Sequence, residues 1–246
     1  MFLDFIKEYP FILAFILGLV PALIWLWFWL KEDRHHEPSK MITLAFLGGM
    51  VAVMFSLPLQ EKIYYYFNNI NDHETLAFTL WAMIEELAKF GFVWFIALRN
   101  KALADEPVDD IIYLIVSALG FVTFENTLFL IDPIKNGEII NTIIHGNLRF
   151  IGASLLHTMS SATIGICMAL SYYKNRKTRV FYTLFGILMA VVLHTTFNLF
   201  IIRQSSGNIF FVFGMVWVSI VILLLLFEKV KHIKDNSKYT EPRKII

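Results

Sequence analysis

The chain has 246 residues, of which 57% are hydrophobic and only 17% are charged. Soluble globular domains carry about a quarter charged residues, so this composition favours an integral membrane protein and leaves no stretch polar enough for a separate soluble domain. The net charge of +1 leaves no broad basic surface for a nucleic-acid partner, and the single cysteine, Cys167, excludes an internal disulfide.

Seven apolar runs, taken in chain order, predict an all-α, polytopic transmembrane helix bundle that forms one integral membrane domain over residues 1–246. Each run is close to the roughly 20 residues that a helix needs to cross the hydrocarbon core of a lipid bilayer. The runs lie at approximately 10–30, 41–59, 76–98, 110–131, 149–172, 180–203 and 209–227, and a short basic tail follows at 228–246.

The basic residues predict the orientation of the chain. The segments 31–40, 99–109 and 173–180 and the C-terminal tail carry most of the 21 Lys and Arg residues. The opposite side of the membrane holds Lys7, Lys62, Lys135, Arg149 and Arg203. Because Lys and Arg concentrate in cytoplasmic loops, we expect the N-terminus outside and the C-terminal tail in the cytoplasm.

Four of the predicted helices carry ionisable or amide side chains inside their apolar runs. A charged group within a bilayer costs roughly 2.5–3.5 kcal/mol on insertion scales, so residues of this kind indicate a functional site. They are Glu85, Glu86 and Lys89 in the third helix, Glu125 and Asn126 in the fourth, His157 in the fifth, and His194 and Asn198 in the sixth.

Four of these side chains are predicted to lie at a similar depth: Glu85, Glu125, His157 and His194. Counted from the outer ends of their helices at 1.5 Å per residue, they lie about 9–14 Å into the membrane. The sequence therefore predicts one layer of carboxylates and imidazoles in the outer half of the bilayer.

Spacing along the helices indicates which side chains share a face. Glu85 and Lys89 stand at i and i+4, so we expect them to form an ion pair on one face of the helix. Glu86 is then expected to point in a different direction around the helix axis. A row of polar and small residues on the fifth helix is expected to pack against neighbouring helices rather than lipid. This row consists of Arg149, Ala153, His157, Ser161 and Gly165.

Motifs on four successive helices resemble those of the PrsW family of intramembrane proteases, which are relatives of the CAAX prenyl proteases and of bacteriocin-processing membrane proteins. The motifs are Glu85-Glu86-x-x-Lys89, Phe121-x-x-x-Glu125-Asn126, His157-x-x-x-Ser161 and His194-x-x-x-Asn198. Two loop segments look similar as well: Asp33 followed by Glu37-Pro38, and Glu106-Pro107-Val108-Asp109. The resemblance covers roughly residues 31–200, which is most of the chain.

The sequence departs from the CAAX protease branch at two motif positions. Glu125 stands where that branch has His, and Lys89 stands where it has Arg. The water-activating Glu–His pair of that branch therefore cannot be transferred intact, and which His assists the Glu stays open.

The resemblance implies a multi-pass protease of a bacterial-type plasma membrane that acts in regulated proteolysis and the stress response. PrsW-like family members are associated with site-1 cleavage of membrane-anchored anti-sigma factors. The implied substrate is a single-span membrane protein that is cut near its outer juxtamembrane segment.

Peptide hydrolysis needs an activated water, a proton shuttle to the leaving amine and hydrogen-bond donors for the oxyanion. We expect Glu85 to activate the water, with Glu86 or Glu125 sharing protons and orienting it. Lys89 would then tune the pair of adjacent carboxylates.

The imidazoles and amides supply the remaining roles in this hypothesis. We expect His157 to be the proton shuttle, and His194 with Asn198 to polarise the scissile carbonyl. Asn126 and Arg149 are expected to support the site.

This mechanism needs no cofactor, but a zinc site stays open as an alternative. Two His and two or three Glu could hold zinc in a His₂Glu arrangement with one open position. Two other classes of protein also stay open. A proton-coupled transporter buries Glu, Lys and His as well, although its helices are often broken by Gly or Pro. A scaffold would bind partners and hydrolyse nothing.

Overall fold

The computed structural model describes residues 9–33, 35–67, 70–203 and 209–233, except for the side chains of residues 70–71, 139–151, 201–203, 209–213 and 215–216. Within these ranges the chain forms seven α-helices and no strand. The helices are α2 (Pro10–Glu32), α3 (Ser39–Tyr66), α4 (Glu74–Val93), α5 (Pro107–Lys135), α6 (Ile139–Leu170), α7 (Arg176–Arg203) and α8 (Ile209–Lys231). Two short helical segments, η1 (Ile70–His73) and η2 (Trp94–Leu98), flank α4. The predicted all-α bundle is confirmed.

Five of these helices are long and apolar enough to cross a membrane. They are α2, α3 and α5 over their full lengths, α6 from Gly152, and α7 as far as Phe200. In α4 the apolar sequence is interrupted by three charged residues, Glu85, Glu86 and Lys89. The chain is therefore a multi-pass membrane protein of the kind that its composition predicts.

Several helices extend beyond the apolar runs that predicted them. The run at 41–59 belongs to α3, which continues to Tyr66, and the run at 149–172 belongs to α6, which begins at Ile139. Hydropathy marks only the apolar part of a helix, whereas polar helix formers such as Glu61 and Lys62 continue its hydrogen-bond ladder. The predicted basic tail likewise begins inside a helix, because α8 reaches Lys231, and residues 234–246 lie outside the described residues.

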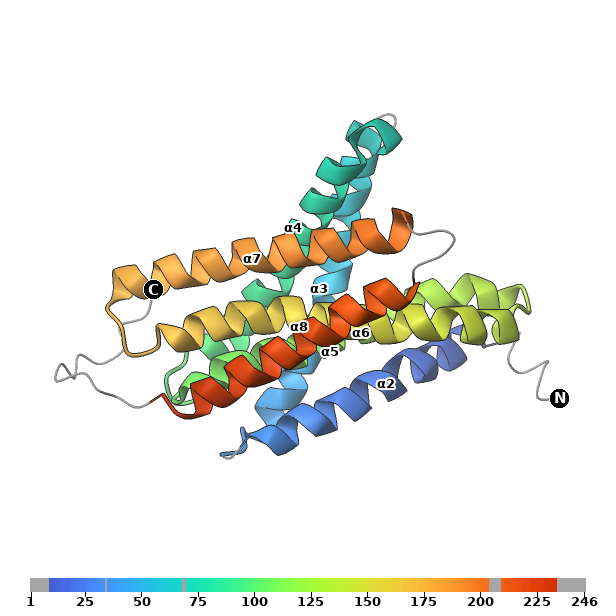
Figure 1. Cartoon of the computed structure of the whole chain (residues 1–246). Coiled ribbons are helices and arrows are strands. Elements are labelled where there is room, and N and C mark those ends of the chain that lie inside the picture. The colour runs from blue at the N-terminus through green and yellow to red at the C-terminus, as the bar shows by residue number, and fades with distance from the viewer. Residues whose placement is uncertain (1–8, 34, 68–69, 204–208, 234–246) are drawn as a thin grey trace.

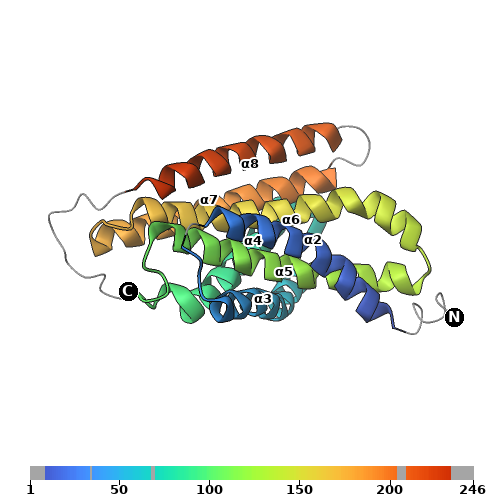
Figure 2. The same ribbon diagram turned by 90° about the horizontal axis from the view of Figure 1, so that it is seen from below.

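The helix α5 forms the centre of the molecule. Every side chain from Pro107 to Thr123 is buried, as expected for a helix that is apolar on all faces. It packs against α2, α3 and α6. Figure 1 shows α5, α6, α7 and α8 running roughly alongside one another, while the paired helices α3 and α4 cross them steeply and project past α7. In Figure 2, α3 is consequently viewed nearly along its axis.

The close approach of α3 to α5 depends on two glycines. A Cβ atom on Gly49 would lie 1.9 Å from the carbonyl oxygen of Ser117, and one on Gly120 would lie 1.9 Å from that of Phe46. Because both contacts are with backbone atoms, no side-chain movement could relieve them. The two glycines therefore fix α3 closely against the central helix.

The loop before α3 is joined to the start of α5. The helix begins with Pro107 in its first turn, where a missing backbone N–H is tolerated, and the carboxylate of Asp109 accepts a 2.6 Å hydrogen bond from the backbone N–H of Glu106. The hydroxyl of Tyr113 donates to the carboxylate of Glu37. The two loop motifs that look PrsW-like are therefore neighbours in space.

Candidate active site

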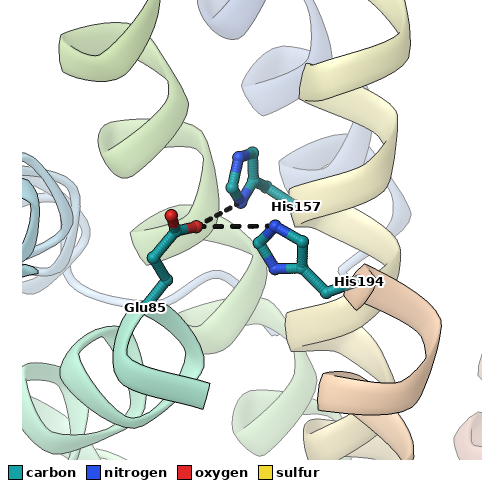
Figure 3. Close-up of side chains that lie close together, drawn as sticks. All are labelled: Glu85, His157 and His194. Carbon is teal, nitrogen blue, oxygen red and sulfur yellow. Dashed lines mark ion pairs between the residues drawn. The ribbon is translucent and has the colours of Figure 1, made fainter. Parts of the chain in front are cut away.

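The predicted polar residues of α4, α6 and α7 meet in one buried cluster, which Glu125 of α5, with a side chain that is 38% exposed, joins at His157. Glu85, Glu86, Lys89, His157 and His194 are all less than 9% exposed. Figure 3 shows Glu85, His157 and His194 projecting toward one another from three different helices. The four helices thus bring together side chains that lie far apart in the sequence, as their common depth predicted.

The cluster borders a cavity of about 260 Å³. Acidic, imidazole and amide groups form one part of its wall, and aromatic and aliphatic groups form the rest. The lining residues are Gln60, Phe78, Trp81, Glu85, Glu125, Asn126, Phe129, Ala153, Leu156, His157, His194 and Asn198.

Glu86 is buried completely, and both of its carboxylate oxygens have partners. Its Oε1 lies 2.6 Å from the Lys89 ammonium and 2.8 Å from His194 Nδ1. Its Oε2 accepts a 3.1 Å hydrogen bond from the hydroxyl of Ser161. These contacts satisfy both oxygens of Glu86 and link α4 to α6 and α7.

The predicted ion pair between Glu85 and Lys89 is wrong, because Lys89 pairs with Glu86 instead. Side chains at i+3 and i+4 both lie on the same side of a helix, so spacing alone does not choose between the two carboxylates. The choice is made by neighbouring helices, which supply Ser161 and His194 to Glu86.

Lys89 is fully buried and is held on several sides. Besides its ion pair with Glu86, its ammonium lies 3.1 Å from His157 Nδ1 and 5.0 Å from the centre of the Phe121 ring. A buried ammonium requires such partners, because desolvation penalises an isolated charge heavily.

The contacts of His157 define its protonation. An ammonium can only donate, so Nδ1 accepts from Lys89. The proton of the neutral ring therefore lies on Nε2, which donates to Glu125 Oε2 at 2.9 Å. His157 is thereby connected to a carboxylate that lines the cavity.

His194 has its two ring nitrogens in different surroundings. Nδ1 faces Glu86 at 2.8 Å, so it carries a proton that it donates to this carboxylate. Nε2 points toward Glu85 Oε2 at 3.5 Å, which is beyond an ordinary hydrogen bond. A carboxylate that orients a histidine through one nitrogen leaves the other nitrogen available for a substrate, a water or a metal ion.

Glu85 is held through only one of its oxygens. The side-chain amide of Gln60 donates to Oε1 at 2.6 Å. Oε2 is buried without a hydrogen-bond partner among the described residues and lies 4.0 Å from His157 Nδ1 and 3.5 Å from His194 Nε2. An unsatisfied buried acceptor costs about 1–3 kcal/mol, so Glu85 carries an unused hydrogen-bond acceptor beside the cavity.

The residues around this oxygen fit a metal ion. Glu85, His157 and His194 each offer one ligand atom, and these atoms lie within 4.8 Å of one another. Two imidazoles and one carboxylate are a common ligand set for catalytic zinc. The unpartnered Oε2 of Glu85 and the orientation of His194 by Glu86 both agree with such a site.

The remaining predicted residues lie as follows. Asn126 and Asn198 line the cavity, and the Nδ2 of Asn126 is buried without a partner in the described part of the chain. The side chain of Arg149 lies outside the described residues, so its predicted supporting role stays a prediction.

Two residues at the site were not identified from the sequence. Gln60 bonds to Glu85, and the indole N–H of Trp81 donates to the backbone carbonyl of Gln60 at 3.1 Å. Gln60 follows the predicted end of the second apolar run, where a polar residue resembles the start of a loop. The only signal for Trp81 is its i, i+4 spacing to Glu85 on the same helix.

Residues 37–226 match a family described as PrsW family intramembrane metalloprotease. Protease PrsW of Geobacillus kaustophilus (strain HTA426) is 23% identical over 232 residues, covering 93% of this chain and 94% of the relative. Protease PrsW of Clostridioides difficile (strain 630) is 26% identical and covers 91% and 92% of the two chains. Protease PrsW of Bacillus subtilis (strain 168) is 26% identical and covers 79% and 84%.

No solved structure matches the chain significantly.

Proposed function

The chain belongs to the PrsW family of intramembrane proteases, and from this premise we propose that it cleaves a single-span membrane protein near that protein's outer juxtamembrane segment. Family membership supports a membrane protease over the transporter and scaffold alternatives. The observation that carries the proposal is the buried Oε2 of Glu85, which faces two histidines beside the cavity and has no hydrogen-bond partner among the described residues.

Glu85 is the group that takes the proton from the attacking water. Its Oε1 is occupied by Gln60, so Oε2 is the oxygen that accepts this proton. Glu86 lies one residue further along α4, but Lys89, His194 and Ser161 occupy its oxygens. Of the two adjacent carboxylates, Glu85 is therefore the base.

His157 and Glu125 move a proton to the leaving amine. In the resting arrangement His157 Nε2 donates to Glu125 Oε2, and Glu125 is accessible from the cavity. When the proton taken up by Glu85 passes to His157 Nδ1, Lys89 gives up its hydrogen bond there, and the proton on Nε2 moves to Glu125 and then to the amine nitrogen. Lys89 holds the imidazole in the tautomer that this transfer requires.

Asparagines on two helices bind the backbone of the substrate. A peptide bond must leave its helix before water can attack it, and backbone groups freed inside a membrane need new hydrogen-bond partners. Asn126 and Asn198 line the cavity, and the Nδ2 of Asn126 is buried without a partner in the described region. Asn198 donates its side-chain N–H to the carbonyl oxygen of the scissile bond, and His194 adds a second donor when Nε2 is protonated as well, because its Nδ1 proton is held by Glu86.

A metal-dependent version of this site uses the same residues. Glu85, His157 and His194 would hold the ion. When bound, a divalent metal ion supplies a Lewis acid that activates water and polarises the carbonyl. Glu86 would then fix the orientation of His194, Glu125 would accept the proton of the water, and Lys89 would compete for Nδ1 of His157.

The substrate that suits this arrangement is a membrane-anchored regulator of the anti-sigma-factor type. The PrsW-like motifs of the sequence support this choice, and the expected depth of the site supports a cut near the outer membrane surface. A single helix that leaves the bilayer at this level presents its juxtamembrane residues to the cavity.

The test is co-expression of the chain with a panel of single-span proteins that carry a reporter outside the membrane. We expect the wild type to release the reporter from at least one of them, and Glu85→Gln to lower the release rate by about 100-fold or more. Glu61→Gln, on the exposed face of α3, is the control and should cleave normally. Cleavage that survives Glu85→Gln at equal membrane abundance would refute the assignment.

A further inference from the structure

Gln60 on α3 donates a hydrogen bond to Glu85, the carboxylate that is proposed as the base. Its Nε2 lies 2.6 Å from Glu85 Oε1, although the two residues are separated by 25 positions in the sequence. An ionised carboxylate has no proton to donate, so the side-chain nitrogen of Gln60, rather than its oxygen, faces Glu85. A short hydrogen bond to an ionised group is roughly twice as strong as a neutral one.

The hydrogen bond from Gln60 fixes the orientation of the Glu85 carboxylate group. A carboxylate can rotate about its last torsion, and an amide donor on Oε1 stops that rotation. The other oxygen, Oε2, is thereby held between His157 and His194, at 4.0 Å and 3.5 Å from their nearer nitrogens. Without the donor either oxygen could turn toward the histidines or away from them.

The backbone of Gln60 is fixed from the same helix that carries Glu85. Trp81, one turn before Glu85 on α4, donates its indole N–H to the carbonyl oxygen of Gln60 at 3.1 Å. Gln60 therefore contacts α4 at two points one helical turn apart. Its backbone carbonyl binds Trp81, and its side chain binds Glu85. The register between α3 and α4 is set directly at the site.

We propose that Gln60 is a positioning residue of the protease site, which orients Glu85 by donating to Oε1 and is itself held by Trp81. This inference rests on the proposed function, since it concerns the carboxylate assigned as the base. Gln60 transfers no proton; it acts through Glu85 by keeping Oε2 directed at the reacting water.

The test measures kcat and KM of purified Gln60→Met in detergent with a substrate that the wild type cleaves. Met has nearly the same volume as Gln but no donor, so packing is kept and only the hydrogen bond is lost. We expect kcat to fall about 10–100-fold, which is the usual effect of losing a partner that orients an active group, while KM stays unchanged. Trp81→Phe keeps the ring and removes the indole donor, and it should lower kcat by a smaller factor.

Three outcomes separate the possibilities. If Gln60→Met lowers kcat with an unchanged KM while it stays folded at the assay temperature, and Glu61→Gln cleaves like the wild type, the positioning role stands. If Gln60→Met cleaves like the wild type while Glu85→Gln is inactive, the positioning role fails and the proposed function stands. If Gln60→Met and Glu85→Gln both cleave like the wild type, the proposed base fails, and the role of Gln60 fails with it.

Discussion

Two neighbouring glutamates on α4 have different surroundings, and the proposed mechanism therefore gives them different roles. Glu86 is fully buried with Lys89, His194 and Ser161 on its oxygens, so it holds the cluster together. Glu85 has one oxygen held by Gln60 and the other turned toward the cavity without a partner among the described residues. At the scale of single residues, the proposed role of each glutamate follows from whether its carboxylate oxygens already have hydrogen-bond partners.

Removing Glu86 should destabilise the protein, whereas removing Glu85 should not. Glu86→Ala leaves the Lys89 ammonium buried without its ion-pair partner, and breaking a buried pair from one side costs about 3–5 kcal/mol. Removing both charges in Glu86→Ala/Lys89→Met should recover much of this loss. Thermal unfolding in detergent, followed by tryptophan fluorescence, measures all of these variants.

Glu85→Ala serves as the matched comparison, because it lies on the same helix and is also buried. It should unfold near the wild-type temperature. Equal destabilisation by Glu85→Ala and Glu86→Ala would contradict the division between a reactive and a structural carboxylate.

At the scale of helices, the site depends on how α3 is held against α5 and α4. Gly49 and Gly120 permit the contact with α5, and Gln60 makes the contact with α4. A shift of α3 would thus move Gln60 and, through it, the Glu85 carboxylate, even though α3 carries none of the proposed catalytic groups.

Adding a single methyl group at the α3–α5 contact should lower stability and activity together. In Gly49→Ala or Gly120→Ala the new Cβ meets a backbone oxygen at 1.9 Å, and overpacking of this kind costs about 1–3 kcal/mol. Gly91→Ala on α4 is the control, since no atom lies within 4 Å of its Cβ position. If Gly120→Ala were as stable as Gly91→Ala in thermal unfolding, the close contact would be refuted.

The loop between α2 and α3 should make stability depend on pH. Burial raises the pKa of Asp33 above its ordinary value of 3.8, and one of its carboxylate oxygens is buried without a partner in the described part of the chain. Burial likewise raises the pKa of Glu37, which Tyr113 contacts. The folded protein therefore binds these protons more tightly than the unfolded chain, so stability falls as the pH rises from acidic toward neutral.

Asp33→Asn removes one of these buried charges and should raise the melting temperature at neutral pH by about 2–4 °C. The gain should shrink at acidic pH, where wild-type Asp33 is protonated as well. Asp132→Asn, whose side chain is 86% exposed, should show no such pH-dependent gain. A gain for Asp33→Asn that is independent of pH would contradict the raised pKa.

At the scale of the whole molecule, the sequence predicts most of the architecture and the identity of the site. Charged residues within apolar runs are costly, so Glu85, His157 and His194 could be identified before their contacts were known. The partner of Lys89 could not be predicted, because two carboxylates lie within its reach along α4. Gln60 could not be predicted either, because its role depends on where α3 crosses α4.

The orientation of the chain stays a prediction that chemical labelling can test. In a Cys167→Ser background, we expect His73→Cys to react with a membrane-impermeant thiol reagent from outside intact cells. Both His73 and Asn175 are exposed, so Asn175→Cys provides the matched position on the other side. It should react only after the membrane is opened, because the basic segments at 173–180 are expected in the cytoplasm. The reverse pattern would invert the assignment.

Exhaustive chelation distinguishes the two versions of the mechanism. If Glu85, His157 and His194 hold a metal ion, chelation should abolish cleavage and added zinc should restore it. His194→Ala should then bind less zinc, as measured by metal content of the purified protein. Full activity after complete removal of metals would leave Glu85 acting directly on water.

The most direct test of the central claim is cleavage in a defined system. The purified chain and one single-span substrate are placed together in liposomes, and the new chain ends are identified by mass spectrometry. We expect wild type to cut one peptide bond in the outer juxtamembrane segment, and Glu85→Gln, His157→Ala and His194→Ala to leave the substrate intact. Cleavage at that bond by Glu85→Gln would show that the Glu85–His157–His194 cluster is not the catalytic site.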